Sequence, residues 1–503
     1  MSDLDELIAA LNSLQAAQQS QQQTKQRGPS DADKLVRLAL DSYIPGRSSS
    51  GDLYGAPIDG TPVVRMLRGG RHSLRAELAA RYWQTYDRAV GDSALSSALA
   101  VVEGMAQTAP PEDVHVRVAP DGADGIVLDL GREDGATVHV TTDGWTVQNP
   151  SPRDRPALFR RSQLINPLPV PERGGDVAEL RELLNVTDST WPMLLAWAVA
   201  ALFPDIAHPL AYITGQHGAA KTTAAAMLVS LLDPSAAPMA PAPRDMDQWG
   251  LRAAASWVVG LDNLSSIPAW LSDALCCAVT GTAIPRRKLY TDSDLAVLAY
   301  RRVLVLNGIE VGAIRGDLAD RMIPIELLPI RDTDRRTDGD VWGAWRQAHP
   351  RILGGLLDTA VQVLRHLPMA RESLVERPRM ADFAEIAAAL DLSCGTRALD
   401  HYWKARETLS ETVIESDAVA TAIQAIAHGR RDSGGPPWRG TPTALLDVLR
   451  VERPEDAKQK GWPRTPKALS DRLARVEPDL GKLGVTITRG RSGGGRWIEI
   501  SAT

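Results

Sequence analysis

Residues 215–223 read GQHGAAKTT, and this stretch decides the fold class expected for the chain. An apolar run typical of a strand, PLAYIT (209–214), precedes it, and a helical run, AAAMLVSLL (224–232), follows it. A glycine-rich loop between a strand and a helix is the context of a phosphate-binding loop, because backbone N–H groups at the helix N-terminus then point at phosphates. The alternative is a Gly/Ala-rich turn that leads into an ordinary helix.

The residues of this loop have separate expected roles. Lys221 would reach the β- and γ-phosphates of ATP, and the hydroxyl of Thr222 would bind Mg²⁺. The stretch matches G-x-x-x-x-G-K-[ST] except at Ala220, which fits in place of glycine if it has helical φ and ψ. The nucleotide site is expected to comprise Gly215, Gln216, His217, Gly218, Ala219, Ala220, Lys221, Thr222 and Thr223.

Two further apolar runs end in polar residues. SWVVGLDNLS places Asp262 after a strand-like run, where a carboxylate would serve Mg²⁺ directly or through water. The next position, Asn263, cannot take a proton from an attacking water. RRVLVLNGIE (301–310) places Asn307 at the end of another run, where it could orient the water or touch the γ-phosphate. The alternatives are a surface acid at Asp262 and an ordinary Asn-Gly turn at Asn307.

Basic residues supply two more sets of candidates. Arg321 and Arg315 are candidates for an arginine finger that acts on the ATP of a neighbouring subunit, Arg321 being preferred. The alternative is that Arg321 pairs with Asp317 or Asp320 on a short helix. Between the acid and the Asn strand, a short hairpin-like segment suits a loop that holds a nucleic-acid backbone, or else is a solvated charge cluster. Its basic residues are Arg286, Arg287 and Lys288, next to Tyr290.

Composition sets the class of protein and its compartment. The chain has 503 residues, 44% hydrophobic and 23% charged, as expected for a globular protein of several domains. No apolar run approaches the roughly 20 residues of a membrane span, and the N-terminus, MSDLDEL, is acidic and unlike a signal peptide. Cys276, Cys277 and Cys394 form no ligand pattern, so a cytoplasmic location is expected.

The net charge is −6, but residues 436–503 carry +5 and the remainder −11, an asymmetry that suggests nucleic-acid contact near the C-terminus. This C-terminal region is expected to be a winged helix. Helices with Thr-Pro starts are predicted at 441–450 and 465–484, and VTITRGRSGGGRWIEI (485–500) is predicted as two strands around a basic tip. The alternative is a winged helix used for protein contact. The expected DNA-binding residues are Lys467, Arg472, Arg489, Arg491 and Arg496.

Changes in hydrophobic period and turn-rich stretches divide the chain. A small antiparallel β unit is expected within 113–149, with Asp129 as a surface residue, and Ser30 is expected to cap the first helix of the α+β domain. The expected domains are a flexible Gln-rich tail (1–28), an α+β domain (29–170), a helical lead-in (171–208), an ATPase core with a parallel sheet (209–330), a helical domain (331–430), a linker (431–440) and the winged helix (441–503).

With these residues assembled, residues 175–430 resemble superfamily 3 helicases and the wider phage, plasmid and mobile-element replication ATPases. The motifs that carry the resemblance are GQHGAAKT, VVGLDN, TGTAIPRRKLYTDSD, VLVLNGIE and DLADRMIPIEL, in this order. The resemblance implies an AAA+-like P-loop α/β core, a ring that is expected to be a hexamer, and single-stranded DNA in its central channel. It also implies that Asn307 is the sensor, Arg321 the finger, and that Arg287 and Lys288 face the channel. Ala220 and Asn263 depart from the pattern.

These features lead to two functional hypotheses of different classes. The first is a ring-forming, ATP-driven DNA helicase or translocase for replication of a phage, prophage or mobile element, with duplex DNA at the winged helix and a primase or other replication proteins as partners. The second is a nucleotide-gated DNA-binding scaffold or loader with little turnover, which Asn263 favours. A third class, a signalling or defence ATPase, would require an effector activity, and no nuclease or protease motif is present.

Overall fold

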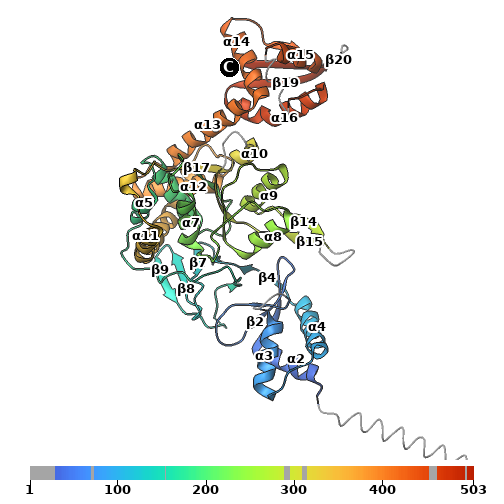
Figure 1. The fold of residues 1–503 in the computed structure, drawn as a ribbon, viewed down its shortest axis with the longest axis vertical. Coiled ribbons are helices and arrows are strands. Elements are labelled where there is room, and N and C mark those ends of the chain that lie inside the picture. The colour runs from blue at the N-terminus through green and yellow to red at the C-terminus, as the bar shows by residue number, and fades with distance from the viewer. Residues whose placement is uncertain are drawn as a thin grey trace, which may run out of the picture. The chain divides into compact units, whose positions relative to one another are not determined.

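The computed structural model describes residues 29–68, 73–152, 154–287, 295–298, 300–308, 314–452, 462–492 and 495–503. The tail expected at 1–28, together with Lys288 and Tyr290, lies outside these residues. Contacts within the chain separate unit 1, formed by residues up to 115 and 150–160, from unit 2, formed by 116–149 and 161–503. Figure 1 shows the ribbon. Among the described residues, no helix is both long and apolar enough to span a membrane.

Unit 1 is a small α+β unit whose first helix begins as the sequence predicts. Ser30 caps this helix, since its side chain accepts a hydrogen bond from the N–H of Asp33 while Asp33 bonds back to Ser30. Four strands form a sheet in the order β3-β2-β1-β4, and β10 pairs with β5. The elements are α2 (Asp31–Ser42), β1 (Tyr43–Ser48), β2 (Leu53–Pro57), β3 (Arg65–Met66), α3 (Leu74–Tyr86), α4 (Asp92–Thr108), β4 (Pro111–Glu112), β5 (Val114–His115) and β10 (Leu158–Phe159).

Unit 2 begins with the antiparallel β unit that the sequence predicts. Its strands pair in sequence order and are β6 (Val118–Asp121), β7 (Gly125–Asp129), β8 (Thr137–Thr141) and β9 (Gly144–Gln148). The expectation that Asp129 is a surface residue is wrong. Its side chain is 1% exposed, and both of its carboxylate oxygens accept hydrogen bonds from Arg161. Sequence alternation placed Asp129 on a strand but could not reveal a partner 32 residues away.

The centre of unit 2 is a parallel sheet of five strands, in the order β12-β13-β16-β11-β17. Each pair of neighbours is parallel, as the alternation of strands and helices in 209–330 predicts. The strands β13 and β16 are buried throughout, because helices can cover both faces of such a sheet. The strands are β11 (Leu210–Thr214), β12 (Met239–Ala240), β13 (Val258–Leu261), β16 (Val303–Asn307) and β17 (Met322–Glu326).

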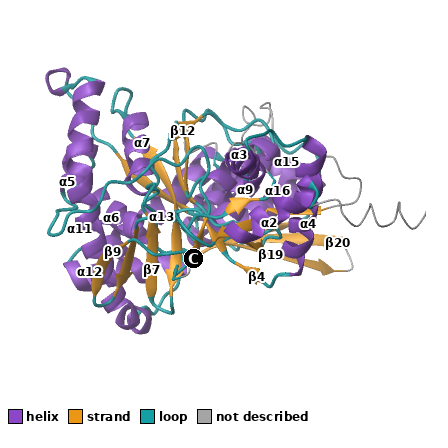
Figure 2. Cartoon of the chain, turned by 90° about the horizontal axis from the view of Figure 1, so that it is seen from below, coloured by secondary structure: helices purple, strands orange, loops and turns teal. Residues whose placement is uncertain are grey.

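Helices surround this sheet and continue beyond it. They are α5 (Glu179–Leu184), α6 (Thr190–Ala200), α7 (Lys221–Leu232), α8 (Met246–Ala255), α9 (Ala269–Thr280), α10 (Gly316–Ala319), α11 (Asp338–Ser373), α12 (Ala381–Cys394) and α13 (Ala398–Ser416), with a 3₁₀ turn, η2 (Asp332–Asp334), before α11. Figure 2 shows α11 beside β9, which it contacts. Two adjacent glycines of α11, Gly354 and Gly355, leave no room for a Cβ because the backbone of 172–177 crosses the helix there.

The last part of unit 2 is a C-terminal subdomain, which we define as residues 418–503. Its core contains residues of α14, which the sequence assigned to the helical region, together with residues of two later helices and a three-stranded sheet in the order β18-β20-β19. In Figure 1, α13 runs from the helices around the parallel sheet to this subdomain, and it contacts both. The elements are α14 (Ala418–Asp432), β18 (Trp438–Gly440), α15 (Pro442–Glu452), α16 (Pro466–Lys482), β19 (Val485–Ser492) and β20 (Gly495–Ala502).

Candidate functional site

The loop 215–220 joins β11, which lies between β16 and β17, to α7, at the carboxyl edge of the parallel sheet where ligands bind in such folds. Gly215 and Gly218 have φ values of 144° and 82°, which residues other than glycine rarely adopt. Lys221 is the first residue of α7, and its ammonium group donates hydrogen bonds to the carbonyl oxygens of Gly215 (2.8 Å) and Gln216 (3.0 Å). The lysine side chain is therefore folded over the loop.

Ala220 does not have the helical backbone that the sequence analysis required of it. Its φ is 58° and its ψ 36°, which is the left-handed region, so the expectation is wrong. A residue with a Cβ pays roughly 1–2 kcal/mol in this conformation relative to the right-handed one. The position before Lys221, where the motif has glycine, therefore has a positive φ, and in this chain alanine adopts it.

Side chains from three successive segments meet beside the start of α7. The hydroxyl of Thr222 donates to Oδ1 of Asp262 (3.0 Å), which directly follows β13. Nδ2 of Asn307, the last residue of β16, donates to the same hydroxyl (3.4 Å), and Oδ1 of Asn307 accepts from the N–H of Asn263 (2.6 Å). Asn263 has a φ of 51°, which asparagine tolerates better than most residues. The structure thus brings together four predicted site residues.

The pair of Thr222 and Asp262 fits the magnesium ion that the motif implies. A hydroxyl and a carboxylate 3.0 Å apart are hard oxygen donors, which is the ligand type that Mg²⁺ takes from proteins at phosphate sites. Asp262 is only partly buried, so its oxygens remain accessible beside the loop. These two residues would hold the ion.

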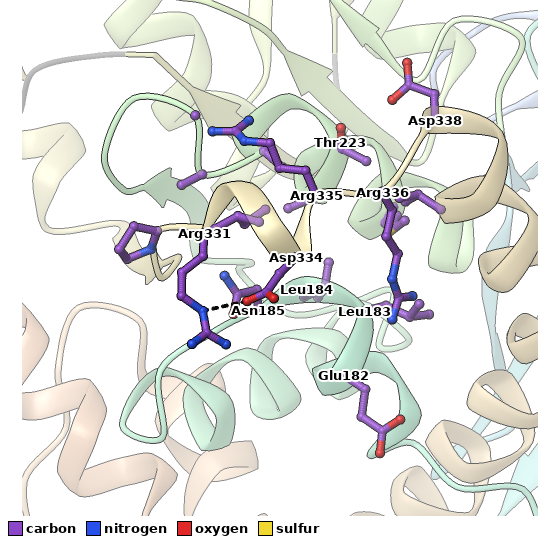
Figure 3. A pocket seen from close by; sticks show the side chains of 18 residues that line it. Glu182, Leu183, Leu184, Asn185, Thr223, Arg331, Asp334, Arg335, Arg336 and Asp338 are labelled. Atoms are coloured by element: carbon purple, nitrogen blue, oxygen red, sulfur yellow. Dashed lines mark hydrogen bonds and ion pairs between the residues drawn. The ribbon is translucent and has the colours of Figure 1, made fainter.

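A cavity of about 460 Å³ is lined in part by this loop. Its walls come from the loop and α7 (Gly218 to Met227), from α5 and the residue after it (Glu182 to Asn185), and from 329–341, which includes the segment between β17 and α11 and the first turn of α11. Figure 3 shows Arg331, Asp334, Arg335 and Arg336 on the last of these walls, with Arg331 paired to Asp334. Its walls combine charged side chains, such as Glu182 and Arg336, with apolar ones, such as Met227, so a pocket of this size suits a small organic ligand with polar and apolar parts.

Arg335 lies against the loop 215–220 itself. A Cβ added at Gly218 would be 2.9 Å from Nη2 of Arg335, and Nε of Arg335 is 3.0 Å from Oδ1 of Asp332. This arginine and the rest of the wall at 329–341 were not predicted from the sequence. The charged run RDTDRR (331–336) was a signal, but nothing in its spacing showed that it folds back over a loop more than 100 residues earlier.

The two arginine-finger candidates occupy different environments. Arg321 is 8% exposed and makes the pair offered above as the alternative, since its Nη1 is 2.8 Å from Oδ1 of Asp317. The side chain of Arg315 is 43% exposed, and its Nη1 is 2.9 Å from the exposed Asp273. Both flank α10 (Gly316–Ala319).

The expected hairpin is present as β14 (Ile284–Arg287) and β15 (Leu295–Leu298), which pair antiparallel. Arg286 and Arg287 lie on β14 opposite Ala296 and Leu295. The chain at Lys288 lies outside the described residues. This hairpin follows α9 and precedes β16, so it is inserted between two strands of the parallel sheet.

The basic residues of the C-terminal subdomain separate into paired and exposed groups. Arg472 on α16 pairs with Asp417 (2.7 Å), and Arg489 on β19 pairs with Glu477. Lys467 is exposed in the first turn of α16. Arg491 and Arg496 are exposed and face each other across β19 and β20. Like charges directly opposite each other destabilise a strand pair, so an anion between them would relieve repulsion.

Together, the parallel sheet, the loop before α7 and the polar cluster at the carboxyl edge describe a mixed α/β protein with a candidate ligand site at that edge. Two family models give the identity. The model of the actinomycete integrative conjugative element replication protein matches residues 177–412, and the model of the C-terminal domain of that replication protein, RepA, matches residues 419–503. Together they match well over half of the chain, which belongs to this family of mobile-element replication proteins.

Other comparisons add little. No curated protein matches the chain. A solved structure of the NrS-1 C-terminal region is 11% identical over 95% of this chain and 100% of that chain, with a TM-score of 0.42. A JCV helicase structure is 11% identical over 47% of this chain and 64% of that chain, with a TM-score of 0.24. Scores this low do not establish a shared fold.

Proposed function

We propose that this replication protein is an ATPase that moves DNA, a helicase or translocase that acts as a ring. The observation that carries the proposal is the contact of Thr222 with Asp262 at 3.0 Å, with Asn307 hydrogen-bonded to the same hydroxyl. A loop threonine, a strand-end acid and a strand-end amide at one edge of a parallel sheet are the parts that phosphoryl transfer from ATP needs. The fold is accordingly proposed to be a P-loop, AAA+-like core.

ATP would lie across the loop, with its triphosphate along residues 215–222 and its base in the cavity beside α5. Lys221 would exchange its contacts with the loop carbonyls for the β- and γ-phosphates, and Arg335 would add positive charge from the cavity side. A bound Mg²⁺ would neutralise charge on the phosphates. Asn307 would orient the attacking water.

DNA would be contacted at two places. The hairpin β14–β15 carries Arg286 and Arg287 and would face single-stranded DNA in a ring channel. The C-terminal subdomain has two helices, α15 and α16, followed by the strand pair β19–β20, which is the order expected for a winged helix. Its exposed basic residues at α16 and at the tip of β19–β20 would contact duplex DNA.

For the finger, the structure favours Arg315 over Arg321. A finger must leave its own subunit to reach the ATP of the next one. Arg321 is buried and held by Asp317, whereas Arg315 is partly exposed and forms an ion pair with the exposed Asp273. We therefore assign the finger to Arg315 and a structural role to Arg321.

Hydrolysis of ATP by the purified full chain, with and without single-stranded DNA, tests this function. We expect multiple turnovers, stimulated by DNA and abolished in Lys221→Ala, which removes the group expected on the phosphates. Binding of ATP to the wild type without turnover would contradict the motor and support a nucleotide-gated scaffold. Asn263 gives that second candidate its support, since an amide next to Asp262 cannot accept a proton from water.

A further inference from the structure

The C-terminal subdomain contacts the short segment that carries both finger candidates. Arg315 is the N-cap of α10, and Arg321 follows its C-cap, Asp320. Lys482, the last residue of α16, forms an ion pair with Asp320. Its ammonium group also lies 3.0 Å from Oδ1 of Asp479, one turn earlier on α16. Lys482 therefore links the C-terminal end of α16 to the C-terminal end of α10.

The contact is close at the start of α10 as well. The carboxylate of Asp479 lies so near Gly316 that a Cβ there would have no room. Asp479 is 5% exposed, and its burial raises its pKa, an effect that Lys482 partly offsets. A carboxyl group buried this far is stabilised mainly by its partners. Asp479 and Lys482 thus contact both ends of α10.

Other charges complete the cluster around α10. Arg379, between α11 and α12, lies 2.7 Å from Asp317 and 4.0 Å from Asp320. Three acids (Asp317, Asp320, Asp479) therefore face three cations (Arg321, Arg379, Lys482). Removal of one partner from a partly buried set leaves the remaining charges uncompensated and shifts the elements that carry them. Only Asp479 and Lys482 come from the C-terminal subdomain.

We propose that Asp479 and Lys482 are positioning residues that hold α10, and with it Arg315, in the place required for ATP hydrolysis. The proposal rests on the proposed function. It makes the C-terminal subdomain part of the hydrolytic machinery as well as a DNA-binding module, because α16 both contacts α10 and carries the exposed Lys467 of the DNA-binding set. The nucleotide pocket itself contains neither residue.

The test compares kcat and KM for ATP in the full chain. Lys482→Met removes the charge and keeps the length of the side chain, and Lys482→Arg keeps the charge. Lys404→Met is the matched control, since Lys404 is an exposed lysine of α13 that pairs with Asp400. A misplacement of about 1 Å at a catalytic group can lower a rate by about a hundredfold. We expect Lys482→Met to lower kcat by about tenfold with KM unchanged, while the other two variants match the wild type.

A double-mutant cycle with Arg315→Ala separates positioning from general destabilisation. If Lys482 acts through Arg315, Lys482→Met should lower kcat little further in the Arg315→Ala background. The proposal would be overturned by an unchanged kcat in Lys482→Met, or by effects of the two mutations on log kcat that simply add. It would also be overturned if the loss of kcat paralleled the loss of melting temperature in every variant. Failure of the proposed function gives a different result, namely a wild type without turnover.

Discussion

At the scale of single residues, Ala220 shows a conflict between the motif and the amino acid. The loop imposes a φ of 58° on a residue with a Cβ. Ala220→Gly should remove this strain and stabilise the folded protein by about 1 kcal/mol, with nucleotide affinity retained. Thermal melting measures the change. Ala219→Gly is the control, because the buried Ala219 has no positive φ and should lose stability instead. Loss of stability in both variants would contradict the strain at Ala220.

Asn263 is the residue whose chemistry limits hydrolysis in the proposed mechanism. It follows Asp262, has a φ of 51°, and its side chain is exposed at the site. Asp tolerates the left-handed region as Asn does, so Asn263→Asp supplies a carboxylate without a change of backbone. We expect kcat for ATP to rise by on the order of tenfold, because a positioned base typically contributes more than that. A kcat equal to that of the wild type would show that water activation does not limit turnover.

His208 makes the stability of the protein depend on pH. It is 1% exposed, neither ring nitrogen has a hydrogen-bond partner among the described residues, and burial, with Arg301 and Arg302 nearby, lowers its pKa to about 3. The folded state therefore excludes a proton that the unfolded state binds below pH of about 6.5. Above pH of about 6.5 the histidine is neutral in both states and does not destabilise the fold. As the pH falls from there toward 3, the free energy of unfolding falls by up to about 1.4 kcal/mol per pH unit.

His208→Phe should keep the ring contact with Trp257, whose centroid is 5.3 Å away, and remove the titration. We expect the melting temperature of this variant to fall less between pH 7 and pH 5 than that of the wild type. His401→Phe, at a partly exposed position, should retain the pH dependence of the wild type. Equal pH dependence in all three proteins would refute the assignment to His208.

At the scale of elements, a buried ion pair ties the antiparallel β unit to the parallel sheet. Arg117, between β5 and β6, donates from Nε and Nη2 to Oδ1 of Asp233 at 3.0 and 2.9 Å. Asp233 caps α7, and its Oδ2 accepts the N–H groups of Trp257 and Val258 at the start of β13. Both side chains are at most 2% exposed. The pair therefore links the C-terminal end of α7 to the start of β13. Thr222 lies at the opposite end of α7, and Asp262 follows the opposite end of β13.

Arg117→Met should destabilise unit 2 by about 3–5 kcal/mol, because it leaves a buried carboxylate without its cation. The exposed pair of Arg132 with Asp134 is a matched control, and Arg132→Met should cost less than about 1 kcal/mol. Urea unfolding of both variants, followed by tryptophan fluorescence, compares them. Similar shifts of the two urea unfolding midpoints would contradict the expectation that the buried pair stabilises the protein more than the exposed one.

At the scale of the whole molecule, the protein combines a site at a sheet edge with a basic C-terminal subdomain. If Arg491 and Arg496 contact phosphates, the double change Arg491→Ala/Arg496→Ala should weaken binding of duplex DNA and lower the slope of log K against log salt by about 2. Arg397→Ala/Lys404→Ala removes two exposed cations that pair with Asp400 and should leave the slope unchanged. Equal slopes in the two double variants would place the DNA contact elsewhere on the chain.

Local elements and the order of the motifs could be predicted from the sequence. Period, turn chemistry and caps act over a few residues, and they predict the strands that end at Thr214, Leu261 and Asn307 and the helix at Lys221. They also predict the hairpin at Arg286 and the capping role of Ser30. Parallel strands then bring their carboxyl ends to one edge, so the meeting of Thr222, Asp262 and Asn307 could also be anticipated.

Contacts between residues distant in the sequence became known only from the folded structure. Ala220 adopts a positive φ because the loop geometry overrides its own preference, and Asp129 is buried because Arg161 lies beside it. Arg335 against Gly218, and Lys482 against Asp320, join segments more than 100 residues apart. No periodic pattern encodes such contacts, since they arise when separate elements pack and the charges between them must find partners.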